Sequence, residues 1–108
     1  MTATSKPAEV AWADPKRKSD FEQWLAPLAA HHGLRSATLR AASADASFRR
    51  YLRIDADKGD SLVVMDAPPP QEDVRPFVKI AQLIQQAGLH GPQVLAADVE
   101  RGFLLLTD

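Results

Sequence analysis

The chain has 108 residues, 45% of them apolar and 25% charged, with a formal net charge of −1 and no cysteine. These values fit one small folded domain. They exclude disulfides, thiolate catalysis and cysteine-based zinc sites, and they give no global attraction to nucleic acid or to an anionic membrane surface. No apolar run is long enough to span a bilayer, and we therefore expect a soluble cytoplasmic protein.

The first 18 residues show no sustained periodicity, which predicts a flexible N-terminal arm. Its isolated indole, Trp12, is expected to dock on the body of the domain. Ser19 and Glu22 then have the spacing of a capping box, in which each residue satisfies a backbone N–H of the first turn. We therefore predict a helix that begins at Ser19 and carries an apolar face toward the core.

This first helix is expected to end at Gly33, a residue type that favours the left-handed conformation after a helix. Pro27 lies inside the apolar pattern and removes one helical hydrogen bond. The sequence therefore predicts a kink or a restart near residue 26.

Five segments have the patterns of β-strands, namely residues 37–42, 49–54, 61–66, 94–99 and 103–107. In the second segment Tyr51 and Arg53 share one face, and Leu52 and Ile54 share the other. The third is almost continuously apolar, which is typical of a strand covered on both faces.

A second helix is predicted over residues 73–87, with Asp73 as its N-cap and Gly88 at its end. The order is therefore helix, three strands, helix, two strands. Short connections favour hairpins, so we predict an α+β fold. It has a five-stranded antiparallel sheet, the 73–87 helix packed across one face, and an additional N-terminal helix.

The connection between the first two strands, residues 43–47, holds small and short polar residues and is followed by Arg49, Arg50 and Arg53. Small residues let a backbone approach a ligand closely, and exposed N–H groups there can bind anionic oxygens. One hypothesis is a loop that covers phosphates; the alternative is an ordinary polar hairpin loop beside a cationic strand. Nucleic-acid binding through these arginines lacks the wider basic surface such domains carry.

Four ordered segments resemble those of aminoglycoside-phosphotransferase-like kinases: Ala46–Tyr51, Val64–Pro69, Gly88–Leu89 with Pro92, and Gly102–Asp108. Over residues 19–108 the chain is similar to the N-terminal lobe of that family. It is closest to the bacterial group that includes the N-acetylmuramate/N-acetylglucosamine kinases of cell-wall recycling. The resemblance implies a lobe that holds ATP, with Mg²⁺ bound mainly by a C-terminal catalytic lobe that this chain lacks.

The resemblance also implies a nucleotide site. Residues of the first loop would lie over the phosphates, two arginines would reach phosphate oxygens, third-strand side chains would face the adenine, and the last residues would lead into the hinge. In chain order the implied residues are Ser43, Ala44, Asp45, Ala46, Ser47, Arg49, Arg50, Val63, Met65, Leu106, Thr107 and Asp108. At Val63 and Leu106 a plain core role is equally open.

Two departures from the family pattern matter: the loop between the first two strands has no glycine, and the third-strand lysine of kinases is absent, its place falling at Met65. Three explanations of the missing lysine are open: an arginine such as Arg53 supplies the charge, which we favour, phosphate binding relies more on the metal and the loop, or the nucleotide site is lost. No histidine is followed two residues later by an aspartate, as the family's catalytic loop requires. We therefore expect no catalytic residue and no metal site in this chain, and no activity from it alone.

The expected function of the full-length protein is transfer of the γ-phosphoryl group of MgATP to a sugar hydroxyl, with ATP and the sugar as its partners. The alternative is a non-enzymatic domain that binds a partner protein through an apolar face or through Pro68–Pro70. Without its second lobe, the fragment is expected to self-associate through an exposed cleft face.

Overall fold

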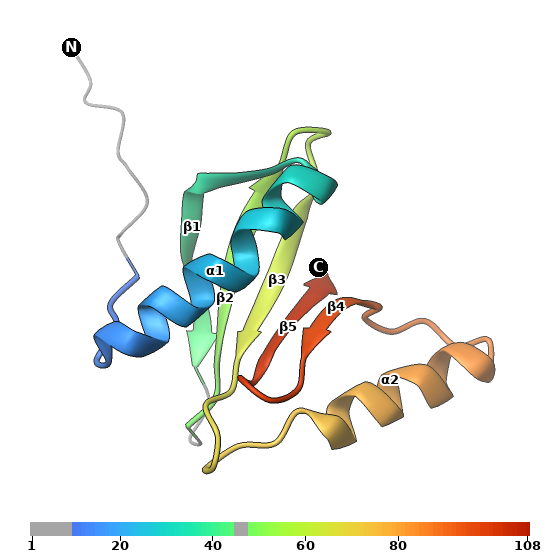
Figure 1. The fold of residues 1–108 in the computed structure, drawn as a ribbon. Helices are drawn as coiled ribbons and strands as arrows, with labels where there is room; N and C mark the ends of the chain where they lie inside the picture. The colour runs from blue at the N-terminus through green and yellow to red at the C-terminus, as the bar shows by residue number, and fades with distance from the viewer. Residues whose placement is uncertain (1–9, 45–47) are drawn as a thin grey trace.

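A computed structural model of the chain describes residues 10–44 and 48–108. Its five strands form one antiparallel sheet in the order β1-β2-β3-β5-β4, and Figure 1 shows the arrangement. This confirms the predicted α+β fold and the order of its elements. The elements are α1 (Pro15–His32), β1 (Leu34–Ala44), β2 (Arg50–Ala56), β3 (Ser61–Asp66), α2 (Arg75–Gln86), β4 (Val94–Asp98) and β5 (Phe103–Thr107).

Helix α1 covers one face of the sheet, and Figure 1 shows it lying across the strands. Its Phe21 and Trp24 pack on Phe103 of β5, with ring centroids 5.6 Å and 5.3 Å apart. Alternate β2 residues, Leu52 and Ile54, are fully buried beneath it. Aromatic pairs of this kind add to the free energy gained from area burial, so α1 is an integral part of the core.

The start of α1 differs from the prediction. The helix begins at Pro15, and the Asp14 side chain accepts a hydrogen bond from the Lys16 backbone N–H at 2.9 Å. Aspartate at the N-cap followed by proline in the first turn is a favourable helix start. The predicted N-cap, Ser19, is therefore wrong by five residues.

The rest of the N-terminal region agrees better with expectation. Trp12 docks on the body, with its ring centroid 5.0 Å from that of Phe21. The helix ends before Gly33, whose φ of 65° is left-handed as predicted. It runs through Pro27 as one continuous α-helix, so the predicted restart near residue 26 is wrong.

The strands follow their sequence patterns closely. In β2 the buried and half-buried side chains alternate as predicted. Strands β3 and β5 have the predicted bounds, β1 extends beyond the predicted 37–42, and β4 ends one residue early. Within the described ranges, neither helix combines the length and the apolar character that crossing a membrane requires.

Helix α2 packs less deeply than predicted. Val74 and the first-turn residues Phe77 and Val78 pack beside Met65, on the face of the sheet opposite α1. Farther along, Ile80 and Leu83 are 57% and 53% exposed. In the view of Figure 1, α2 extends beyond β4 instead of across the sheet. The predicted packing of the 73–87 helix across one face holds only for its beginning.

The predicted N-cap of α2 is off by one residue. Val74 occupies that position and makes no side-chain capping bond. Asp73 still accepts a hydrogen bond from the Arg75 backbone N–H at 3.0 Å. The capping chemistry expected of Asp73 is therefore present, one position upstream of the cap itself.

Candidate functional site

The cross-strand register shows which residues share the face of the sheet opposite α1. Arg53 of β2 lies opposite Arg40 of β1 and Val63 of β3. Val63 in turn lies opposite Leu106 of β5. Because directly opposed residues in an antiparallel pair point to the same face, one row of side chains runs from two arginines to an apolar patch. We call this face the open face.

A second row runs parallel to the first. Ser43, Tyr51, Met65 and Leu104 are successive partners across β1, β2, β3 and β5. Four residues implied by the family resemblance, at positions 43, 63, 65 and 106, therefore lie on the same face of the sheet. The resemblance also named residues 45–47, which lie outside the described residues, and Ala44, the last residue of β1.

Burial separates the apolar members of this face. Met65 is fully buried and Leu106 is only 4% exposed, because Val74 and the start of α2 pack over them. Val63 is half-buried at the margin of the same cluster. Core packing therefore accounts for Met65 and Leu106, while Val63 presents apolar surface that a flat ligand could contact. Most of the exposed large apolar residues in the described ranges lie on and after α2, such as Leu83 and Leu89, and Phe48 before β2 is exposed as well.

Arg49 lies at the end of the β1–β2 connection and is held by a carboxylate. Its Nε and Nη2 atoms are both 3.0 Å from Oε1 of Glu72, in the segment before α2. A hydrogen bond with Tyr51 and, against the opposing effect of burial, the bond with Glu72 raise the pKa of Arg49. The result is a fixed guanidinium beside the loop. Sequence reasoning named Arg49 but gave Glu72 no role, since its distance from Arg49 in sequence is 23 residues.

The other cations of the open face are also paired. Arg53 Nε donates to Oδ2 of Asp108 at 2.7 Å, and the Ser61 hydroxyl donates to the same oxygen. These two hydrogen bonds lower the pKa of Asp108. Arg40 Nη2 donates to Asp55 at 3.0 Å. Any anion that binds here therefore meets guanidinium groups already oriented by carboxylates.

Arg50 lies apart from this set, on the face that α1 covers. Its Nε donates to Oδ2 of Asp66 at 2.7 Å, and its guanidinium lies 4.4 Å from the ring centroid of Trp12. The sequence could have shown this, because Arg50, Leu52 and Ile54 are alternate residues of one strand and therefore point to the same face. We leave Arg50 out of the candidate site for this reason.

The neighbouring residues Thr107 and Asp108 make different kinds of contact. The Thr107 hydroxyl accepts a hydrogen bond from the Gln93 backbone N–H at 2.9 Å, which fixes the end of β5 to the start of β4. Its register partner Leu62 belongs to the α1 core. Asp108 lies beside Arg53, and its role is therefore electrostatic where that of Thr107 is structural.

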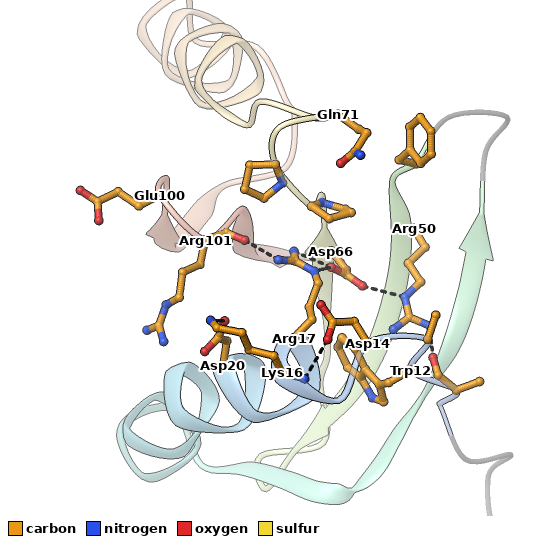
Figure 2. Close-up of a pocket in the computed structure, with 15 residues that line it drawn as sticks. Trp12, Asp14, Lys16, Arg17, Asp20, Arg50, Asp66, Gln71, Glu100 and Arg101 are labelled. Carbon is orange, nitrogen blue, oxygen red and sulfur yellow. Dashed lines mark hydrogen bonds and ion pairs between the residues drawn. The ribbon is translucent and has the colours of Figure 1, made fainter.

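A pocket of about 670 Å³ lies on the α1 side, between the segment before α1, the start of the helix and the proline segment after β3. Figure 2 shows Asp66 in this pocket, between Arg17 and Arg50. The remaining charged residues at its wall include Lys16, which pairs with Asp20 at 3.1 Å. Because charges of both signs alternate around it, the pocket has no single-signed surface for an anion.

No group of three acidic or histidine side chains that could hold a metal ion is found among residues 10–44 and 48–108. The chemistry that these residues offer is instead apolar contact at Val63 and anion contact at oriented arginines. This combination suits a ligand with a flat apolar part and an anionic part.

Comparisons with known proteins identify the family. Residues 38–108 match the model of the phosphotransferase enzyme family. The chain is 66% identical over 73 residues to an N-acetylmuramate/N-acetylglucosamine kinase of Pseudomonas aeruginosa, covering 67% of this chain and 21% of that protein. Kinases of the same name match from Pseudomonas putida, 58% identical over 73 residues (68% and 21%), and from Neisseria meningitidis serogroup B, 39% over 93 residues (86% and 26%). The chain thus spans about a fifth to a quarter of these relatives.

Proposed function

Because the chain belongs to the phosphotransferase enzyme family, we propose that it forms the ATP-holding lobe of a kinase that phosphorylates an amino sugar. The acceptor would be a hydroxyl of N-acetylmuramate or N-acetylglucosamine, and the donor the γ-phosphoryl group of MgATP. The observation that carries this proposal is the 66% identity to a relative of that name over 73 residues. Such an enzyme would act in the cytoplasm, where MgATP is available, and would return cell-wall sugars to use.

The two ends of the open face carry different charged groups, and this difference would orient the nucleotide. Arg49 and Glu72 lie at the end of the face next to the β1–β2 connection, whereas Asp108 follows the other end of β5. The adenine would pack against Val63, and the triphosphate would extend toward Arg49 and away from the carboxylate of Asp108. Flat apolar rings gain from apolar contact, and phosphates gain from a charged donor.

Within this proposal, Arg49 takes the place of the missing third-strand lysine. Arg53, the substitute expected from the sequence, is bound to Asp108 and lies in the middle of β2. Arg49 is beside the loop, and its raised pKa keeps it charged at any working pH. A guanidinium offers five N–H donors, so a phosphate oxygen would bind Arg49 alongside Glu72. Mg²⁺ would neutralise the phosphates, held by ligands from the remainder of the protein.

The test is phosphoryl transfer by the complete gene product with MgATP and a panel of N-acetylmuramate, N-acetylglucosamine and an aminoglycoside. We expect turnover of at least one N-acetylated amino sugar. Loss of one charged hydrogen bond costs about 1.5–3 kcal/mol, so Arg49→Ala should raise the KM for ATP about tenfold or more. Arg35→Ala is the matched control, because Arg35 pairs with Asp57 at the far end of β1.

Two outcomes would contradict the proposal. A complete gene product that neither binds ATP nor phosphorylates any of these acceptors would remove its basis. An Arg49→Ala variant with the same KM for ATP as Arg35→Ala would remove Arg49 from the site.

A further inference from the structure

Asp66 is an unusual residue for its position. It is the one charged residue among the described ranges whose side chain is buried, with the whole residue only 4% exposed. Each of its oxygens has its own guanidinium: Arg17 Nε donates to Oδ1 at 2.7 Å, and Arg50 Nε donates to Oδ2 at 2.7 Å. A carboxylate buried between two arginines stands at a fixed place, because moving it would leave three charges without partners.

The two arginines extend this contact to other segments. Arg17 donates from Nη1 to the carbonyl of Arg101 at 2.7 Å and lies 4.2 Å from the ring centroid of Phe103. Arg50 donates from Nη1 to the carbonyl of Ala11 at 2.7 Å. A single carboxylate thus joins the segment before α1, α1 itself, the start of β2, the end of β3 and the β4–β5 turn, as Figure 2 shows in part.

Arg50 connects this cluster to Arg49. Arg50 is the first residue of β2, and Arg49 precedes it directly. Arg50 binds Asp66 on the α1 face, while Arg49 binds Glu72 on the open face. Asp66 is the last residue of β3, and Glu72 lies in the segment that joins β3 to α2. Two consecutive arginines therefore join the start of β2 to the end of β3 and to the segment that follows it, from opposite faces of the sheet.

We infer that the Arg17–Asp66–Arg50 cluster is a positioning element for nucleotide binding, and that it acts through Arg49. The inference rests on the proposed function. Asp66 does not contact the nucleotide. It fixes the backbone of Arg50, and this holds the adjacent Arg49 in the position where Glu72 can orient its guanidinium. Without the cluster the start of β2 shifts, and Arg49 no longer binds the phosphates in a fixed orientation.

The test is a double-mutant cycle on the complete gene product, with the dissociation constant for ATP measured by calorimetry. We expect Asp66→Asn and Arg49→Ala each to weaken ATP binding about tenfold, and the double variant also by about tenfold instead of a hundredfold, because residues acting as a unit are non-additive. The KM for the sugar should stay within about twofold of wild type. Asp20→Asn is the matched control, since Asp20 lines the same pocket without contacting Asp66.

A merely structural Asp66 would lower the melting temperature and the folded fraction but leave the dissociation constant of the folded protein unchanged. That result, or effects that multiply in the double variant, would overturn the inference. If Asp66→Asn does not fold, Arg50→Lys replaces it in the cycle, because it keeps a cation beside Asp66 and loses the fixed fork geometry. Wild-type protein that binds no ATP would instead contradict the proposed function itself.

Discussion

The two helices of this chain use their apolar residues in opposite ways. Helix α1 has a broken pattern with Pro27 inside it, yet its Phe21, Trp24 and Leu25 are buried. Helix α2 has a clear apolar stripe, yet Ala81 is its one buried residue and Ile80 is more than half exposed. An apolar stripe shows which side of a helix needs a partner. It does not show that the partner lies in the same stretch of chain.

How far each helix is buried depends on the segments that pack against it. Phe103 of β5 and alternate residues of β2 pack against α1, so its aromatic side chains contact rings from distant segments. Helix α2 meets the sheet through Val74 and its first turns, and its later turns continue past β4. Substitutions in the two regions should therefore differ in cost, and the following four experiments test that difference.

The largest effect is expected at Phe21. Truncation of a buried phenylalanine costs about 3–5 kcal/mol, and Phe21 is 2% exposed among three other aromatic rings. Phe21→Ala should lower the free energy of unfolding by that amount in urea denaturation. A loss below about 1 kcal/mol, the size of an ordinary surface change, would mean that α1 is not part of the cooperative core.

A glycine pair gives the next contrast. Gly102 and Gly88 both have left-handed φ values, 78° and 74°. A Cβ at Gly102 would lie 2.0 Å from the Ala67 carbonyl oxygen, whereas nothing lies within 4 Å of one at Gly88. Gly88→Ala should cost about 1 kcal/mol for backbone strain alone, and Gly102→Ala about 3 kcal/mol because the clash adds to it. Equal costs in thermal unfolding would contradict the close approach of the β4–β5 turn to the end of β3.

A smaller effect concerns acid pH. Burial acts to raise the pKa of Asp98, but hydrogen bonds from the backbone N–H and guanidinium of Arg101 outweigh it and lower the pKa. A depressed pKa gives stability that is present above the unfolded value of about 3.9 and is lost as the pH falls below it. Between pH 5 and pH 3 the free energy of unfolding of Asp98→Asn should therefore fall by about 0.5 kcal/mol less than that of the wild type. The difference is small because partly exposed pairs contribute little. Parallel pH profiles would show that this pair does not stabilise the turn.

The smallest effect is expected on α2. Ile80→Ala in the 108-residue chain should change the free energy of unfolding by no more than about 0.5 kcal/mol, as at other surface positions. In the complete gene product the same substitution should cost about 2 kcal/mol or more if further sequence covers the stripe. Equal, small costs in both would show that the stripe has no partner within the protein.

The sequence predicted the sheet better than the helices. Short strand patterns are local signals: they gave β3 and β5 with their bounds exact, and the period-two alternation of β2 placed its start within one residue and its end within two. The start of α1 was missed because Ser19 and Glu22 formed the more familiar pattern. The pair Asp14–Pro15 was an equally valid signal. The Arg17 side chain of this first turn binds Asp66, at a separation of 49 residues that no local pattern shows.

The candidate site was predicted in part for the same reason. Alternation could place Val63 on one face, and it would have placed Arg50 on the other had it been extended by two residues from Leu52. The burial of Met65 could not be read locally, because it depends on how α2 begins. The partner of Arg49 could not be predicted locally either. Glu72 contacts Arg49 only because the chain after β3 folds back past the start of β2.

The order of the strands has a consequence for synthesis. Strand β5 is the last element of the chain, yet it lies between β3 and β4 and supplies Phe103 to the α1 core. On a ribosome that adds about 5–20 residues per second, α1 and the first three strands would wait several seconds for it. During that interval β3 exposes an unpaired edge and α1 an uncovered aromatic face.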